Sequence, residues 1–286
     1  MKRFSHIVIA SDLDGTLLAK NEAGDARNLD RIRYFIENGG HFTVASGRGP
    51  CQIEGRIPYP LSLCNLPVVT ANGACLYDFS AARPICEYPM SHETIVRLYE
   101  YLKQYFPSVG IRASAATCMY AEDDRNPYIR RDCETLKKIL RFMPVSEWAS
   151  GHVYKIAARG DADTIAAAWS ALEQEFGNEL ELATSGAMTL DIQCKGRTKA
   201  KMLQEAVADY LPYPTVLCTV GDYENDAEMH SLSDLPCCPE NATDHIKSIC
   251  RLHLCHHSKG VIGDLIDYLD SHDVSQLATK KGYENA

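Results

Sequence analysis

Several features common in exported, membrane-bound and nucleotide-binding proteins are missing from this chain of 286 residues. No segment is of low complexity, and no apolar run approaches the roughly 20 residues that a membrane-spanning helix needs. An apolar run near the start ends at Asp12, well short of a signal peptide's hydrophobic region. The chain has no GxxxxGK(S/T) loop, and residues 47–49 lack the third glycine of a dinucleotide fingerprint. We therefore expect neither export, nor membrane insertion, nor a common nucleotide-binding fold.

Net positive charge is also lacking. The formal charge is −9, so the surface as a whole repels polyanions, and we expect neither nucleic acid nor acidic membrane as a partner. Cysteine is plentiful, with 12 residues, but paired CxxC spacing is missing even from the densest group. That group is Cys250, His253, Cys255, His256 and His257. Without an export signal, reduced thiols and a cytoplasmic location are expected.

Alternating strand and helix patterns predict an α/β fold. Short apolar runs, typical of strands buried on both faces of a parallel sheet, occur at 6–11, 42–45, 67–70 and 215–220. Helical apolar spacing predicts helices at about 28–38 and 198–210. This order indicates a doubly wound, Rossmann-like parallel sheet with helices on both sides.

The middle of the chain has an alternation of its own. Ser91 is expected to cap one helix and Asp163 to begin another, and strand patterns occur at 111–120, 153–157 and 180–184. Turn signals at 81–84 and at 185–186 indicate where this stretch begins and ends. We therefore predict a core made of residues 1–82 and 188–286, with an inserted α+β cap domain at 83–187.

Polar side chains follow the carboxyl end of each predicted core strand. They are Asp12 and Asp14, then Ser46, Gly47 and Arg48, then Asn72 and Gly73, and finally Asp222, Asn225 and Asp226. Ligands bind at this edge of an open parallel sheet. Gathered carboxylates repel one another unless a cation compensates, and oxygen-only ligands favour Mg²⁺ over zinc or copper. Because an isolated aspartate after a strand commonly forms a turn, the prediction depends on all four groups together.

Four segments together resemble the motifs of haloacid dehalogenase phosphatases. They are DLDGTLL at 12–18, SGR at 46–48, the lysine at 199 and GDYENDAEM at 221–229. Their order and spacing are similar to those of Cof-type hydrolases, in which a large α/β cap separates the second and third motifs. The resemblance implies a Mg²⁺-dependent phosphomonoester hydrolase that acts on a small phosphorylated metabolite, such as a sugar phosphate, through an aspartyl-phosphate intermediate.

The resemblance also implies the catalytic roles. Asp12 is the expected nucleophile, while Asp14 protonates the leaving oxygen and later deprotonates the attacking water. Ser46 donates a hydrogen bond to the phosphoryl group, and Lys199 offsets negative charge on the nucleophile and the transferring group. Lys195 is the rival for the lysine role. Lys199 is preferred because it opens the helix that follows the turn at 196–198, as in the family's motif.

The metal and its surroundings follow from the same resemblance. The carboxylates of Asp12 and Asp222 and the backbone carbonyl of Asp14 are the implied Mg²⁺ ligands. The residues expected to bind phosphate or to support the metal and the lysine are Gly47, Arg48, Asn72, Asn225 and Asp226. Direct coordination of the metal by Asp226 is left open.

Two other functions remain open. A phosphomutase of the same superfamily would need a bisphosphate activator and would form an isomer instead of phosphate. A non-catalytic phosphate-binding protein or a phospho-accepting receiver domain would gather the same side chains, although receivers are shorter and have no inserted cap. The polar cap residues considered for the substrate, with surface exposure as the commoner outcome, are Tyr120, Arg125, Arg130 and Arg131. No oligomeric state is predicted.

Overall fold

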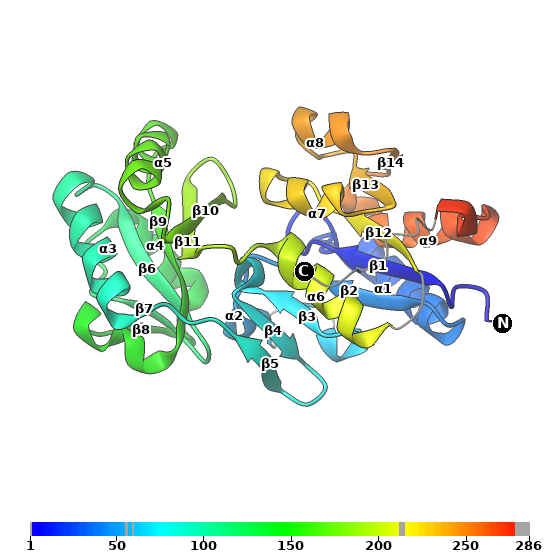
Figure 1. The fold of residues 1–286 in the computed structure, drawn as a ribbon, viewed down its shortest axis with the longest axis horizontal. Coiled ribbons are helices and arrows are strands. Elements are labelled where there is room, and N and C mark those ends of the chain that lie inside the picture. Colours follow the sequence, from blue (N-terminus) through cyan, green and yellow to red (C-terminus); the bar gives the residue numbers. More distant parts are fainter. Residues whose placement is uncertain (1, 55–56, 59, 212–214, 278–286) are drawn as a thin grey trace.

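The computed structural model describes residues 2–54, 57–58, 60–211 and 215–277, so the end of the predicted segment 188–286 lies outside the described residues. Two lobes lie side by side, one built on a five-stranded sheet and the other on a six-stranded sheet (Figure 1). Among the described residues, no helix combines the length and the apolar character needed to cross a membrane.

The five strands of the core sheet all run parallel. In spatial order they are β14 (Leu252–Leu254), β13 (Leu235–Pro239), β12 (Val216–Val220), β1 (Ile7–Ser11) and β2 (His41–Val44). In β1, Ile7 and Ile9 pack with helices on one face, while Val8 and Ala10 pack with helices on the other. Both faces of the strand are thus buried, which confirms the predicted doubly wound core.

Helices cover both faces of this sheet. Those on the Ile7 side are α1 (Glu22–Glu37) and α9 (Val261–Ser271), and those on the Val8 side are α6 (Lys199–Tyr210) and α7 (Ala227–Ser231). The shorter helices of the lobe are α2 (Pro50–Ile53) and α8 (Asp244–Ile249). Helix α1 begins six residues before the predicted 28, because the Asn21 side chain accepts a hydrogen bond from the Gly24 amide at 2.9 Å. Its first turns are polar and carry no apolar stripe, so the apolar spacing starts only at Leu29.

The predicted third strand does not join the parallel sheet. It forms an antiparallel sheet composed of β3 (Val68–Thr70), β4 (Cys75–Asp78) and β5 (Arg83–Glu87). A single parallel bridge, Ala45 to Val69, connects β3 with the end of β2. The chain reverses at Ala71 and Asn72, both with φ near +50°, so β3 pairs with the strand that follows at once. An apolar run predicts that a strand forms, but the turn that follows it determines which strand it pairs with.

The second lobe has a mixed sheet of its own. Its strands, in spatial order, are β10 (Leu180–Thr184), β11 (Thr189–Cys194), β9 (Val153–Arg159), β6 (Gly110–Ala115), β7 (Met119–Ala121) and β8 (Leu140–Phe142). Helices α3 (His92–Tyr105) and α5 (Ala162–Phe176) pack against one face through an apolar cluster. Ser91 caps α3 as predicted, and α5 begins one residue before the predicted Asp163. Helix α4 (Pro127–Leu136) packs in a separate cluster with Met119 and Leu140.

Both turns that suggested domain boundaries lie inside hairpins. Residues 81–82 connect β4 with β5, and residues 185–186 connect β10 with β11. Strand β11 therefore belongs to the six-stranded sheet, although the sequence assigned residues 188 onward to the core. Turn signals mark a chain reversal, and a hairpin produces the same signal as a domain crossing. We propose that the cap comprises residues 89–196, between Tyr88 and Arg197.

Candidate active site

The register of two adjacent strands brings Asp12 and Asp222 together. In the core sheet Ser11 pairs with Val220, so the residues that follow β1 and β12 emerge at the same level. The Asp12 amide donates a hydrogen bond to the Val220 carbonyl at 2.8 Å, which extends this pairing by one residue. The predicted strand-end site therefore forms at the centre of the sheet, where neighbouring parallel strands end together.

Three carboxylates gather at this point. Asp12, Asp222 and Asp226 each offer one oxygen within 4.8 Å of the others, the single such group of metal-binding side chains within the described ranges. Asp12 and Asp226 are buried and Asp222 is partly buried. Hard oxygen ligands in a small cluster suit Mg²⁺ better than a softer transition metal. The chemistry of the donor set thus fits the predicted ion.

The electrostatics of the cluster favour a cation. Burial raises the pKa of Asp12 to about 8, with Lys199 opposing and the carboxylates of Asp226 and Asp222 adding to the shift. Burial and Asp226 likewise raise the pKa of Asp222 to about 6. In their ionised forms the three carboxylates would carry more negative charge than the single lysine offsets. A divalent ion would stabilise their ionised forms and lower both pKa values.

Lys199, and not Lys195, contacts the carboxylate cluster. It is the first residue of α6, and the Thr198 side chain caps that helix by accepting from the Lys201 amide. Its Nζ donates to Asp12 Oδ1 at 2.6 Å and to Asp226 Oδ1 at 2.9 Å. Burial alone would lower the pKa of Lys199, but the two carboxylates outweigh burial and raise it. The rival, Lys195, is half-exposed and pairs with Glu181 instead.

Two hydrogen-bonded supports fix the loop that carries Asp222. Asp226 Oδ2 accepts from the amides of Asp222 and Tyr223 at 3.1 and 3.2 Å, so Asp226 holds the loop as well as the lysine. Thr16 Oγ1 donates to Asp222 Oδ1 at 3.0 Å. Sequence reasoning assigned Thr16 no role, although it lies in the DLDGT motif. Gly15, which directly precedes Thr16, has φ +82°. A Cβ at this position would lie 2.5 Å from Asp222 Oδ2, so a side chain would clash.

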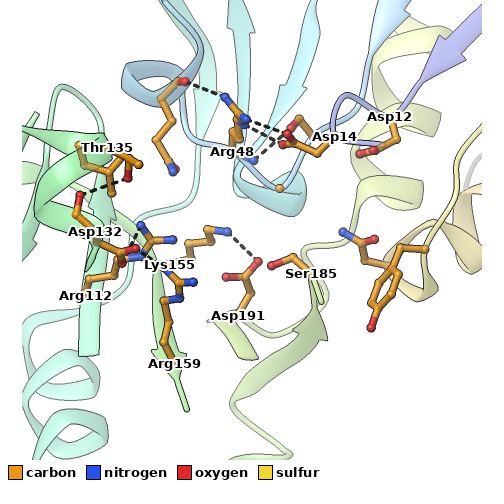
Figure 2. Close-up of a pocket in the computed structure, with 16 residues that line it drawn as sticks. Asp12, Asp14, Arg48, Arg112, Asp132, Thr135, Lys155, Arg159, Ser185 and Asp191 are labelled. Atoms are coloured by element: carbon orange, nitrogen blue, oxygen red, sulfur yellow. Dashed lines mark hydrogen bonds and ion pairs between the residues drawn. The ribbon is translucent and has the colours of Figure 1, made fainter. Parts of the chain in front are cut away.

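The side chain of Asp14 lies apart from the carboxylate cluster and is held by Arg48 (Figure 2). Arg48 Nε and Nη2 donate to the two oxygens of Asp14, each at 2.7 Å. The pair is partly exposed at the mouth of a cleft. This position of the side chain is compatible with metal binding by the Asp14 backbone carbonyl, the role that the family resemblance implies.

The remaining predicted residues line the neighbouring edge. Ser46 is buried after β2, and its Oγ accepts from the Arg48 amide at 3.1 Å. A Cβ at Gly47 would lie 2.9 Å from Asn72 Oδ1, so the loop needs glycine there. Asn225 Nδ2 donates to the same Asn72 oxygen at 3.4 Å. Asn72 Nδ2 in turn donates to Asp191 of the second lobe at 3.0 Å, so Asn72 connects the two lobes.

A cleft of about 580 Å³ separates the lobes at the site. Figure 2 shows Asp12, Asp14 and Arg48 on one side of it and a group of charged residues from the second lobe on the other. That group is Arg112, Asp132, Lys155, Arg159 and Asp191. The volume suits a small molecule rather than a folded protein.

Sequence reasoning missed this second-lobe wall. Of the four residues considered earlier, Tyr120 is buried beside Gly151, and Arg125, Arg130 and Arg131 are exposed, and none of them lines the cleft. The signal that could have found the wall is the alternation of charged and apolar residues in GIRASA at 110–115 and VYKIAAR at 153–159. Such alternation predicts a strand with one polar face.

Known proteins resemble the chain along most of its length. The sequence profile of the haloacid dehalogenase-like hydrolases matches residues 9–266. The 5-amino-6-(5-phospho-D-ribitylamino)uracil phosphatase of Bacillus subtilis strain 168 is 22% identical over 261 residues, which cover 84% of this chain and 89% of that protein.

Solved structures share the fold. The protein SMU.1108c of Streptococcus mutans UA159 has a TM-score of 0.82 at 22% identity, covering 93% of this chain and 99% of its own. A sugar phosphatase described as subclass IIB of the same superfamily has a TM-score of 0.76 at 14% identity, covering 92% and 99%. The predicted family and the predicted enzyme class, a phosphatase among the hydrolases, are confirmed. The chain belongs to the haloacid dehalogenase-like hydrolase family.

Proposed function

We propose that the protein is a Mg²⁺-dependent phosphomonoester hydrolase in which Asp12 attacks phosphorus. The observation that carries the proposal is the position of the Asp12 carboxylate, which opens onto the cleft, contacts Lys199 at 2.6 Å and lies beside Asp222 and Asp226. The names of the Bacillus subtilis relative and of the subclass IIB structure, both phosphatases of phosphorylated small molecules, support the same class of reaction.

Two displacements at phosphorus complete the proposed reaction. An Asp12 carboxylate oxygen forms a bond to phosphorus while the bond to the leaving oxygen breaks, and Asp14 gives that oxygen a proton. Water then attacks the aspartyl phosphate, Asp14 removes a proton from that water, and the bond from phosphorus to Asp12 breaks to release phosphate.

The surrounding residues stabilise charge during both displacements. Mg²⁺, held by Asp12 and Asp222 with Asp226 beside them, would supply positive charge to the phosphoryl oxygens. Lys199 offsets the charge of Asp12, and Ser46 and the Gly47 amide donate hydrogen bonds to the transferring group.

Phosphate release from a panel of phosphomonoesters tests the proposal. We expect release with Mg²⁺ and none after chelation, with Asp12→Asn as the inactive control. A phosphomutase would convert a sugar phosphate to its isomer after addition of a bisphosphate, without release. A binding protein would give neither product. A folded, Mg²⁺-loaded protein that releases no phosphate from any member of a broad panel would contradict the proposal.

The location proposed for the protein is the cytoplasm. All twelve cysteines are thiols in the structure, which supports a reducing compartment. Export of the protein by cells that express the full chain would contradict this location.

A further inference from the structure

The cap sheet turns a polar face toward the catalytic residues. Arg112 in β6 and Asp191 in β11 both pair with Ala157 in β9, so these three residues form one row across the sheet. Lys155 and Arg159 lie two residues to either side of Ala157 and therefore share its face. The small side chain of Ala157 leaves room between the four charged ones. The alternate residues, such as Ile156, pack in the apolar cluster with α3 and α5.

Two arginines of this face share one carboxylate. Arg159 Nη1 donates to Asp132 Oδ1, and Arg112 Nη1 lies 3.2 Å from Asp132 Oδ2. The Asp132 side chain is 6% exposed and that of Arg112 is 15% exposed, so water screens the group weakly. Burial lowers the pKa of Arg112, and the like charge of Arg159 adds to this effect although Asp132 opposes it. The shared carboxylate thus leaves the two guanidinium groups incompletely neutralised.

Lys155, the third cation of this face, shares its partner Asp191 with Asn72. Lys155 Nζ donates to Asp191 Oδ2 at 2.7 Å, and Asn72 Nδ2 donates to the same oxygen at 3.0 Å. One oxygen of each carboxylate, Asp132 Oδ1 and Asp191 Oδ2, thus accepts hydrogen bonds from the protein, whereas Nε of Arg112 and of Arg159 is buried with no hydrogen-bond partner among the described residues. Three cations face two carboxylates, so the wall carries one positive charge in excess and more donors than acceptors.

We propose that Arg112 and Arg159, with Lys155 beside them, bind a second acidic group of the substrate, either a carboxylate or a second phosphate. The inference depends on the proposed function, because it places the scissile phosphoryl group at Asp12 across the cleft. An acidic group has only acceptors to offer, which matches the excess of donors, and guanidinium groups bind such oxygens in pairs. A neutral polyol can accept from these donors, but it carries no charge to offset the excess positive charge of the wall. The opposite wall, with Asp12 and Asp14, repels an anion that lacks a metal beside it.

Matched pairs of substrates test the proposal. Phosphorylated aldonic acids of two to six carbons are compared with the phosphorylated alditols of the same length, which differ only in a CH₂OH in place of the carboxylate. Alditol bisphosphates form a third arm and distinguish a second phosphate from a carboxylate. At the length that spans the cleft we expect kcat/KM for the acid or the bisphosphate to exceed that for the alditol by about 10- to 100-fold. Equal values at every length would overturn the proposal, even for an active phosphatase.

Single substitutions assign the preference to the arginines. Arg159→Met and Arg112→Met should reduce the ratio of acid to alditol kcat/KM to near one, and Arg159→Lys should retain part of it. Arg125→Met is the matched control, because Arg125 is an exposed arginine of the same lobe that pairs with Asp123 away from the cleft. If Arg112→Met fails to fold, Arg159→Met alone decides. A folded Arg159→Met protein with the parent's ratio would overturn the proposal.

A binding measurement separates this inference from the proposed function. Calorimetry with the Asp12→Asn protein and Mg²⁺ compares affinity for the same acid and alditol without turnover. A preference for the acid that Arg159→Met removes supports the anion site, whether or not the parent releases phosphate. Phosphate release without any such preference retains the hydrolase and rejects the site.

Discussion

Arg48 donates two hydrogen bonds of 2.7 Å to the carboxylate of Asp14, one to each oxygen. In this arrangement both oxygens of the proposed acid accept hydrogen bonds from Arg48. A substrate phosphoryl group would give Arg48 another partner of the same charge. We therefore expect substrate binding to release Asp14 from Arg48. Asp14 would then be available for proton transfer only when substrate is bound.

The identity of the leaving group should reveal the role of Asp14. Asp14→Asn should reduce kcat on alkyl phosphates by about 10²- to 10⁴-fold, the usual contribution of a general acid, and reduce it less on aryl phosphates. An aryl oxide leaves without a proton, whereas an alkoxide needs one. Rates over a series of leaving groups of graded acidity provide the measurement. An Asp14→Asn protein with full activity on a sugar phosphate would refute the acid and base role.

Replacement of the nucleophile should abolish turnover while the fold survives. For Asp12→Asn we expect a loss of kcat of about 10³-fold or more, because no covalent intermediate can form. The change also removes one of the crowded buried carboxylates, so the melting temperature should stay the same or rise. Phosphate release and calorimetry on one preparation check both statements. Substantial turnover by the folded variant would exclude Asp12 as the nucleophile.

The stability gained from Mg²⁺ should depend on pH. The pKa values of Asp12 and Asp222 are raised in the folded protein to about 8 and about 6. The folded state therefore binds more protons than the unfolded chain, and the metal-free protein loses stability as the pH rises from about 4 through those values. Protons compete with Mg²⁺ for the same oxygens. Saturating Mg²⁺ should thus raise the melting temperature more at pH 8 than at pH 5.5.

Thermal unfolding with Mg²⁺ and with a chelator, at both pH values, provides the measurement. Asp222→Ala should lose most of the Mg²⁺ response and so acts as the control. Activity should follow the same metal requirement, and Ca²⁺ should inhibit because its looser coordination displaces the nucleophile. A Mg²⁺ response of equal size at the two pH values would contradict the assignment of these carboxylates.

The ion pair between Lys155 and Asp191 should matter for stability. The two side chains are 8% and 1% exposed, so removal of one partner leaves a buried charge. Asp191→Ala should lower the free energy of unfolding by about 3–5 kcal/mol. Asp123→Ala, which breaks the exposed contact with Arg125, should have little effect. Urea denaturation of both variants measures the difference, and similar small losses would show that the buried pair is not stabilising.

Substrate selection should be separable from catalysis. Arg197 lies over the Tyr88 ring, 3.4 Å from its centre, so the two ends of the proposed cap meet. Replacement of residues 89–196 by a short linker should preserve hydrolysis of a small aryl phosphate better than it preserves the ranking of sugar phosphates. Circular dichroism confirms that the core is folded. A core-only protein with the parent's full ranking would show that selection lies elsewhere.

The sequence predicted which strand-end residues lie close together, but it did not predict which residues of the second lobe face them. Asp12 and Asp222 could be placed together because short runs buried on both faces belong to a parallel sheet, whose strands end at one edge. Arg112 and Arg159 could not be placed at the cleft, because the pattern of a strand with one polar face does not show which part of the protein that face contacts. Their position opposite Asp12 depends on the strand pairing of β6, β9 and β11 and on how the two lobes pack. The two turns used for the expected boundaries lie inside hairpins for a similar reason, since hairpin turns and domain crossings contain the same types of residue.

Every residue proposed for phosphoryl transfer lies outside the stretch between Tyr88 and Arg197. Because the two ends of this stretch lie together, it can lengthen, shorten or be exchanged without shifting the strands that carry Asp12 and Asp222. We therefore expect mutations in this stretch to alter which metabolite is accepted while they leave the residues proposed for phosphoryl transfer in place. Such a chain could change its substrate without a new way to break the phosphate ester.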